Sequence, residues 1–217
     1  MTTALVAPLF PEGVVVVERD PAAVFGRLFP EEEASIASAV EKRRREFAAG
    51  RLLAREALGR LGVAPLALPV GEGRAPRWPQ GVVGSIAHTR GLCAVAVAHA
   101  GAAVAGLGVD VEPDVPLKDA LLQRIALPAE RERLARAGDP ARLGKLLFCA
   151  KEALYKAQYP ATRTFLGFHD VELELDPATG RFSVRAVARG ALADLKGLSG
   201  VVRITGGFVV AGAVLAG

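Results

Sequence analysis

The sequence predicts an α/β fold made of two similar halves. Each half begins with a strand pattern, continues with helical patterns and ends with several strand patterns, although no clear residue-level repeat relates the two. Hydrophobic residues make up 51% of the 217 residues, which is enough to bury a substantial core. We therefore place the halves at residues 1–105 and 106–217, joined near Ala105.

The first half carries one long helical pattern among strand patterns. Pro30 and the acidic residues after it start a short helix, and Gly62 ends a longer one in which apolar residues recur at helical spacing. The predicted elements are, in order, a strand over 13–18, helices over 31–39 and 41–61, a Gly- and Pro-rich loop over 71–81, and strands over 82–86 and 92–98 with a turn over 88–91.

The second half repeats this plan with more strands. Pro128 divides its first helical pattern, and Tyr159 with Pro160 closes its second. The predicted elements are a strand over 106–111, helical segments over 117–137 and 142–158, and strands over 171–175, 182–187, 201–204 and 208–215.

Three carboxylates are candidates for one metal site. Asp110 and Glu112 alternate on a strand and therefore point to the same side of a sheet. Glu152 lies in a helical stretch with Lys156 one turn later on the same face. Convergent carboxylates without a histidine or cysteine cluster suit a hard divalent ion, above all Mg²⁺. Because Mg²⁺ is usually held by carboxylates together with substrate phosphates, the pattern predicts chemistry on a phosphate-bearing substrate.

Each of these features also has an ordinary structural explanation. Asp110 and Glu112 would suit the solvated face of a strand end, and Glu152 with Lys156 would suit an exposed ion pair worth a few tenths of a kcal/mol. The glycines before Asp110 and the strand-ending Pro113 favour a functional site instead, because sites commonly lie where a strand ends.

The composition excludes several classes. The net charge is +4, concentrated in a basic run over 42–45 and at Arg51 and Arg55, but aromatic residues form only 6% of the chain and do not interleave with these cations. A stacking platform for single-stranded nucleic acid is therefore not expected. No apolar run is long enough to span a bilayer, and the first residues lack the basic start of a signal peptide. Cys93 and Cys149 lie in apolar stretches, which favours buried free thiols and a cytoplasmic protein.

The basic run and His88 are candidates for binding phosphate. Such a run would ordinarily be a solvated helix face, whereas in a binding role Arg51, two turns further on, would add a bidentate contact. His88 follows a strand pattern, where a lone histidine is more often a structural residue than a catalyst. The sequence has no Gly-x-Ser-x-Gly or paired cysteine and histidine pattern that would support covalent catalysis.

Six motifs follow one another between residues 41 and 168, namely Arg45-Glu-Phe-Ala-Ala-Gly-Arg51, Gly73-Arg-Ala-Pro-Arg-Trp-Pro79, Gly84-Ser-Ile-Ala-His88, Gly108-Val-Asp-Val-Glu112, Lys151-Glu-Ala-Leu-Tyr-Lys156 and Leu166-Gly-Phe168. In their order and spacing, these motifs resemble the 4′-phosphopantetheinyl transferases of the longer, two-half type, which includes the enterobactin-synthetase and surfactin-synthetase activating enzymes. The enterobactin type is the more similar of the two.

The resemblance implies an enzyme that moves the phosphopantetheine arm of coenzyme A to a serine of acyl or peptidyl carrier proteins and releases adenosine 3′,5′-bisphosphate. Such enzymes activate carrier domains in polyketide, nonribosomal-peptide or fatty-acid synthesis. The resemblance further implies Mg²⁺, a monomer, an active site in the cleft between the halves, and neither a nucleic-acid nor a membrane partner.

The same resemblance implies roles for individual residues. Asp110, Glu112 and Glu152 would hold Mg²⁺, Glu152 would also take the proton of the carrier serine, and Lys156 would contact phosphate and assist the leaving group. The remaining contacts to coenzyme A, largely to its phosphates, would come from Lys42, Arg51, Arg74 and His88, of which Lys42 stands in a basic run of ambiguous register.

Two other function classes remain compatible with the residues alone. A different Mg²⁺-dependent phosphotransferase or phosphodiesterase would share the carboxylates without needing the ordered Arg, His and Lys elements. A non-catalytic protein that binds carriers or nucleic acid would explain the positive charge but would leave the carboxylates without a role.

Overall fold

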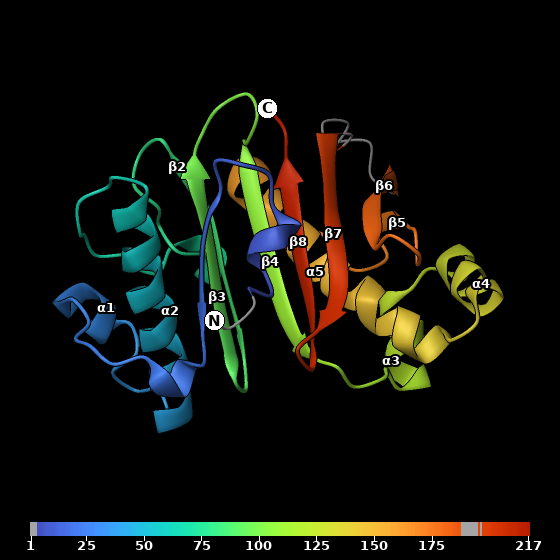
Figure 1. Cartoon of the computed structure of the whole chain (residues 1–217), viewed down its shortest axis with the longest axis horizontal. Coiled ribbons are helices and arrows are strands. Elements are labelled where there is room, and N and C mark those ends of the chain that lie inside the picture. The colour runs from blue at the N-terminus through green and yellow to red at the C-terminus, as the bar shows by residue number, and fades with distance from the viewer. Residues whose placement is uncertain (1–3, 188–194, 196) are drawn as a thin grey trace.

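Two antiparallel sheets, each lying against one long helix, form the protein (Figure 1). The computed structural model describes residues 4–187, 195 and 197–217. The first sheet has the order β1-β3-β2 and the second has the order β4-β8-β7-β6-β5. The strands are β1 (Val15–Arg19), β2 (Val82–Thr89), β3 (Leu92–His99), β4 (Gly106–Pro113), β5 (Val171–Leu175), β6 (Arg181–Val187), β7 (Leu198–Thr205) and β8 (Phe208–Leu215). The helices are α1 (Pro30–Ala34), α2 (Glu41–Arg60), α3 (Asp119–Ile125), α4 (Pro128–Ala137) and α5 (Pro140–Thr162).

The predicted mixture of helices and sheets is confirmed. It takes the α+β form, because every pairing between the described strands is antiparallel. The order β1-β3-β2 corresponds to β4-β8-β7, and β5 and β6 extend the second sheet at one edge. The division of the chain at residue 105 stays a prediction.

Helix α2 buries one face against the first sheet. Leu53, Ala57 and Leu58 are buried together with Val95 and Val97 of β3. Because the helix residues recur at the spacing of one turn, they form a single apolar stripe that faces the strand. The opposite face of α2, which carries most of its charged residues, remains available to solvent.

Helix α5 approaches β4 unusually closely, and two glycines make this possible. A Cβ atom at Gly108 would lie 1.8 Å from the carbonyl oxygen of Ala153, and one at Gly106 would lie 2.2 Å from that of Ala157. Any side chain at these two positions would therefore push the helix away from the strand. This close approach brings the side chains of α5 over the end of β4.

The two sheets meet where β2 lies beside β4. The backbone N–H of Val109 donates to Oγ of Ser85 at 3.0 Å, and Ala87 is buried in one apolar cluster with Val109 and Val111. Val6 and Leu9, at the start of the chain, join the same cluster. Figure 1 shows this segment in blue across the face of the sheets that α2 and α5 do not cover.

Several element boundaries differ from the prediction, including the end of β4, which reaches Pro113 and not residue 111, and both ends of β7, which spans Leu198–Thr205 and not 201–204. Helix α5 continues through Pro160 to Thr162, because the lost N–H of one proline removes a single hydrogen bond while the rest of the helix stays packed on the sheet. It ends at Arg163, whose left-handed backbone (φ 53°) lets its N–H donate to the carbonyl of Tyr159. Strand β2 extends to Thr89, so His88 lies in the strand and not in the turn. Helix α1 ends at Ala34, five residues before the predicted end.

A residue-level repeat, which the sequence reading missed, relates α2 to α5. Ala54-Arg-Glu-Ala-Leu-Gly-Arg60 in α2 corresponds to Ala150-Lys-Glu-Ala-Leu-Tyr-Lys156 in α5. In both helices the second alanine and the leucine are buried against a sheet. Similar segments, identical at four of seven residues, thus occupy the same place in each helix-and-sheet unit.

Both cysteines are buried free thiols, as predicted. Burial raises the pKa of Cys93 to about 12, so this thiol stays protonated at neutral pH. Across residues 4–187, 195 and 197–217, no helix combines the length and the apolar composition that crossing a membrane requires.

Candidate active site

Asp110 lies near the end of β4, buried beneath α5. Its side chain is 8% exposed, and its Oδ1 accepts a hydrogen bond from Nζ of Lys156 at 2.7 Å. The same ammonium donates to the carbonyl of Val109 at 3.0 Å. Oδ2 is buried and has no hydrogen-bond partner among the described residues. A buried carboxylate oxygen without a donor is costly, and a bound cation would satisfy it.

Glu112, two residues along β4, is held by a second lysine of α5. Nζ of Lys145 donates to its Oε2 at 2.6 Å. One rung further, Arg142 pairs with Asp114 at 3.3 Å. Two residues of a strand and one turn of a helix cover similar lengths, so Lys145 and Arg142 match Glu112 and Asp114 in register. Lys156 lies about three turns from Lys145 and reaches Asp110 outside this register. The sequence reading named Glu112 but missed Lys145, whose partner lies 33 residues away.

Glu152 faces these two acids from α5. Burial raises the pKa of Glu152 above its usual value, and the nearby charges of Asp110 and Glu112 raise it further, while Lys156 offsets part of the effect. Burial opposes the charge on Lys156, but Asp110 and Glu152 outweigh it, so the pKa of Lys156 is raised and the ammonium stays charged. Three carboxylates therefore share a partly sheltered site with one lysine.

The carboxylates are not gathered into a ready-made metal cluster. In the part of the chain that the structure describes, no three His, Cys, Asp or Glu side chains converge closely enough to hold an ion. The donor set nevertheless fits Mg²⁺, because it consists of hard carboxylate oxygens, includes a buried oxygen without a donor among the described residues, and contains a carboxyl group whose pKa is raised by burial and by its acidic neighbours.

A cationic groove lies next to the carboxylates, between α2, β2 and the loop before β2. Its cavity has a volume of about 410 Å³, and four basic side chains line it, namely Arg43, Arg51, Arg74 and His88, together with one acid, Glu46. The charges of Lys156 and Asp110 act on His88, so the groove and the carboxylate site adjoin each other. Three of the four side chains are residues that the sequence predicted to contact coenzyme A.

Arg51 is fixed in this groove by several contacts. Its Nε donates to the carbonyl of Leu68 at 2.7 Å, and its guanidinium lies 4.3 Å from the ring centroid of Phe47. Burial lowers the pKa of Arg51 to about 10, with Arg43 adding to the effect and Glu32 opposing it. The group remains charged at neutral pH and is held in one orientation.

His88 is neutral in this environment. Burial lowers its pKa, and the nearby Arg43 adds to this, although Glu46 opposes it. Nη1 of Arg43 donates to Nε2 of His88 at 3.2 Å. Both side chains line the groove, from two different elements, α2 and β2.

The structure places Lys42 outside the groove. Its side chain is 80% exposed, pairs with Glu46 at 3.8 Å and borders a separate cavity that Arg45 and Arg90 also line. Arg43, the next residue, lies one helical turn before Phe47 and two turns before Arg51 on the groove face. Helical phase, counted back from Arg51, is the signal that would have selected Arg43 from the basic run.

A small apolar cavity of about 150 Å³ lies beside Glu152. Its walls come from α5 and from the segment after it and include Tyr155, Phe165, Leu166 and Phe168. Phe165 is 75% exposed at its mouth. The motif around Leu166 that the sequence reading quoted therefore lies next to the carboxylates.

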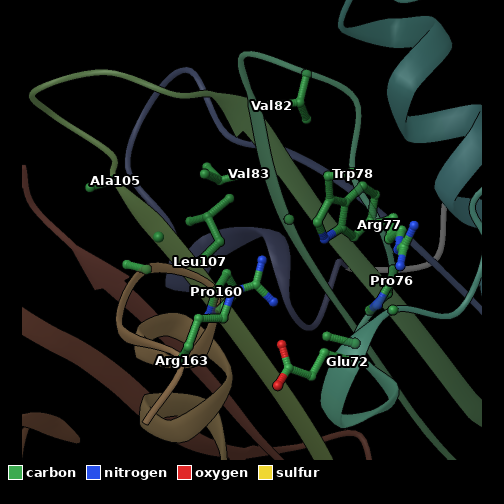
Figure 2. A pocket seen from close by; sticks show the side chains of 15 residues that line it. Glu72, Pro76, Arg77, Trp78, Val82, Val83, Ala105, Leu107, Pro160 and Arg163 are labelled. Carbon is green, nitrogen blue, oxygen red and sulfur yellow. The ribbon is translucent and has the colours of Figure 1, made fainter.

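A larger cavity, of about 630 Å³, lies at the other end of β4 (Figure 2). Figure 2 shows Glu72, Arg77 and Trp78 of the loop before β2 across from Pro160 and Arg163 at the end of α5. None of the predicted site residues lines it.

Known proteins match both parts of the chain. The model of the 4′-phosphopantetheinyl transferase N-terminal domain matches residues 31–98, and that of the 4′-phosphopantetheinyl transferase superfamily matches residues 106–205. The chain is 48% identical over 178 residues to 4′-phosphopantetheinyl transferase Svp of Streptomyces mobaraensis, and this match covers 80% of the chain and 71% of the relative. The chain is 44% identical over 167 residues to 4′-phosphopantetheinyl transferase PptT of Mycobacterium tuberculosis, and this match covers 74% of the chain and 73% of the relative. It is 37% identical over 143 residues to enterobactin synthase component D of Escherichia coli, covering 64% and 66%.

Proposed function

This chain belongs to the 4′-phosphopantetheinyl transferase superfamily, and from that premise we propose which of its residues carry the reaction. The enzyme transfers the phosphopantetheine arm of coenzyme A to a serine hydroxyl of a carrier protein. The reaction needs charge neutralisation on a pyrophosphate and removal of one proton from the serine. The carboxylate site and the adjoining cationic groove can supply both.

Asp110, Glu112 and Glu152 are the residues that would hold Mg²⁺. The single observation that carries this assignment is the buried Oδ2 of Asp110, which has no donor among the described residues. The charges of Asp110 and Glu112 both act on Glu152, which places the three acids in one region. When bound, the ion would neutralise charge on the pyrophosphate of coenzyme A. Lys156 stays on Oδ1 of Asp110 and keeps that carboxylate oriented.

Glu152 is the candidate base for the carrier serine. A carboxyl group with a raised pKa is a better proton acceptor than an ordinary glutamate, and the raised value moves it toward working pH. Its position at the mouth of the small apolar cavity allows a serine hydroxyl to reach it from outside. The flexible arm of coenzyme A would lie along Tyr155, Leu166 and Phe168.

Lys156 would stabilise the leaving group. Its pKa is raised, so it remains an ammonium throughout the reaction. Only two of its three protons are used in the bonds to Asp110 and Val109, which leaves one donor for a phosphate oxygen. Negative charge builds up on that oxygen as the arm departs, and a fixed cation stabilises it.

The cationic groove would hold the phosphates of the adenosine end. Arg51, Arg74 and His88 keep the roles predicted for them, and Arg43 joins them because it lines the same cavity. Guanidinium groups suit phosphate because they donate in a planar fork. The position of Lys42 outside the groove gives its predicted role no support.

The predicted partners, state and location complete the proposal. Carrier proteins with an acidic surface around the serine would be attracted by the net positive charge of this chain. A monomer in the cytoplasm, without nucleic-acid or membrane partners, remains the expectation.

Incubation with coenzyme A, Mg²⁺ and an apo carrier protein tests the proposal. The carrier should gain the mass of the phosphopantetheine arm, and removing Mg²⁺ with a chelator should stop the gain. Asp110→Ala should abolish most of it, whereas Asp114→Ala, a change of the acid beyond Glu112 that is not assigned to the metal site, should leave it largely intact. Equal activity of the Asp110→Ala variant and the wild type would refute the assigned metal site.

A further inference from the structure

We propose that Lys145 is an internal counter-ion of the active site, which holds Glu112 while no metal is bound and competes with a divalent cation for that carboxylate. The proposal rests on the proposed function, because it takes Glu112 as a metal ligand.

The contact between Lys145 and Glu112 is short and sheltered. Nζ of Lys145 lies 2.6 Å from Oε2 of Glu112, and the side chain of the lysine is only 11% exposed. The ring of Phe148 lies on the other side, 5.4 Å from the ammonium to its centroid. Phe148 packs in turn against Phe168, so the ammonium is enclosed on its apolar side.

Binding of a cation would affect the hydrogen bonds of Lys145 and of Lys156 differently. Lys156 binds Oδ1 of Asp110 and a backbone carbonyl, so Oδ2 can accept a cation without any loss to that lysine. For Lys145, Glu112 is the one hydrogen-bond acceptor within the described ranges. A divalent ion on Glu112 would therefore place two cations on one carboxylate and leave a sheltered ammonium without its acceptor.

The neighbouring ion pair of Arg142 and Asp114 distinguishes a competition for Glu112 from a general effect of positive charge. Arg142 and Asp114, the neighbouring pair, have side chains that are 51% and 25% exposed, and neither belongs to the proposed metal site. A general effect of positive charge on metal binding would act through Arg142 as well as Lys145. A competition for Glu112 would act through Lys145 alone.

Mn²⁺ binding to the metal-free protein, followed by electron paramagnetic resonance of the free ion at constant ionic strength, tests the proposal. Lys145→Met should lower the Kd for Mn²⁺ by on the order of tenfold, the scale of one partly buried ion pair. Lys145→Arg, which keeps the charge, should bind like the wild type, and Arg142→Met should change the Kd less than about twofold. The Mg²⁺ concentration for half-maximal transfer should fall in parallel with the Kd of Lys145→Met.

The outcomes separate this inference from the proposed function. Asp110→Asn should lose Mn²⁺ binding, and if it binds like the wild type the assigned metal site itself falls. If Asp110→Asn behaves as expected while Lys145→Met binds Mn²⁺ equally or more weakly, Lys145 only positions Glu112 and the competition is overturned. Equal tightening by Lys145→Met and Arg142→Met would also overturn it. Thermal unfolding of each variant without metal confirms that the compared proteins are folded.

Discussion

Helices α2 and α5 carry similar segments of seven residues, yet the pKa of the glutamate is shifted in opposite directions in the two segments. In α2, Glu56 is held by Arg19 of β1 through two bonds of 2.7 and 2.9 Å and by Arg60 at 2.7 Å. These bonds, led by Arg19, lower the pKa of Glu56. In α5, Glu152 faces acids instead of arginines, and its pKa is raised.

The difference comes from the neighbouring strand and not from the helix. Strand β1 presents Arg19 where the helix carries its glutamate, whereas β4 presents Asp110 and Glu112. The glutamate of this helical pattern is therefore ion-paired and structural in one unit, and surrounded by acids and suited to accept a proton in the other. The Lys-Glu-x-x-x-Lys pattern alone is not evidence of catalysis. The residues of the strand that the pattern faces determine whether its glutamate is structural or suited to catalysis.

The largest expected effect follows from this contrast. Glu152→Gln keeps the shape of the side chain but cannot accept the serine proton, so kcat should fall by roughly 10²–10⁴-fold while coenzyme A binding survives better. Glu56→Gln changes the equivalent residue of α2 and should leave kcat within about twofold. Steady-state kinetics with one apo carrier protein measure both. A similar loss in the two variants would show that the comparison between the helices is mistaken.

The residue before each glutamate shows where the two units remain alike. Arg55 pairs at 2.7 Å with Glu32, which is fully buried at the start of α1, and Lys151 pairs at 2.7 Å with Glu130, which is 2% exposed at the start of α4. Each buried glutamate also accepts the N–H of the residue just before its helix. Each further accepts a backbone N–H from a distant segment. Both pairs thus fasten a short helix to the long one.

Breaking either buried salt bridge should lower the free energy of unfolding by a similar amount. Arg55→Met and Lys151→Met each leave a buried carboxylate without its cation, and the free energy of unfolding should fall by about 3 kcal/mol. Arg60→Met removes a cation from an exposed pair and should cost less than about 1 kcal/mol. Chemical denaturation measures all three. If Lys151→Met costs no more than Arg60→Met, the fastening in the second unit is not structural.

These fastenings also mark what the sequence could and could not predict. The valine run of β1 and the periodic leucines of α2 predicted those elements because their signal is local. Glu32 and Glu130 read as ordinary acids of a helix start, since the basic partner of each lies more than 20 residues away. Pro160 read as a helix end because the packing that carries α5 past it is tertiary.

The same distinction applies to the candidate site. Alternation on one strand was enough to predict that Asp110 and Glu112 share a face, and helical spacing was enough to join Glu152 to Lys156. The pairing of Lys145 with Glu112 needs the antiparallel alignment of α5 and β4, which no local pattern contains. Arg43 was within reach of local reasoning, because its phase relative to Arg51 places it on the groove face.

A third test asks whether α2 contributes a phosphate-binding arginine, Arg43, to the site. Arg43 faces the cationic groove and Lys42, its neighbour, faces away. Arg43→Ala should raise the KM for coenzyme A by on the order of tenfold, the scale of one charge-assisted contact to phosphate. The KM for 3′-dephospho-coenzyme A should change less, because that substrate lacks a phosphate for the groove to hold. Lys42→Ala should leave both values unchanged, and a larger effect of Lys42→Ala than of Arg43→Ala would reverse the assigned helix phase.

The smallest expected effect is a difference of sign in how the two glutamates influence stability. The pKa of Glu56 is lower in the folded protein than in the unfolded chain, so its contribution is present above its unfolded pKa and is lost as pH falls through the folded value. The pKa of Glu152 is raised, so the folded state favours the protonated form, and its charge destabilises the fold as pH rises through the raised value.

At neutral pH without metal, Glu56→Gln should therefore lower the free energy of unfolding, by less than about 1 kcal/mol because the pair is partly solvated. Glu152→Gln should raise it under the same conditions. The Glu152 difference should shrink toward zero as the pH falls below the unfolded pKa of about 4.3, whereas the Glu56 difference should shrink only as the pH falls further, through its lowered folded pKa. Urea unfolding between pH 3 and 8 in a chelator measures them, and changes of the same sign at pH 7 would mean that the two strands do not impose opposite environments on the shared helix sequence.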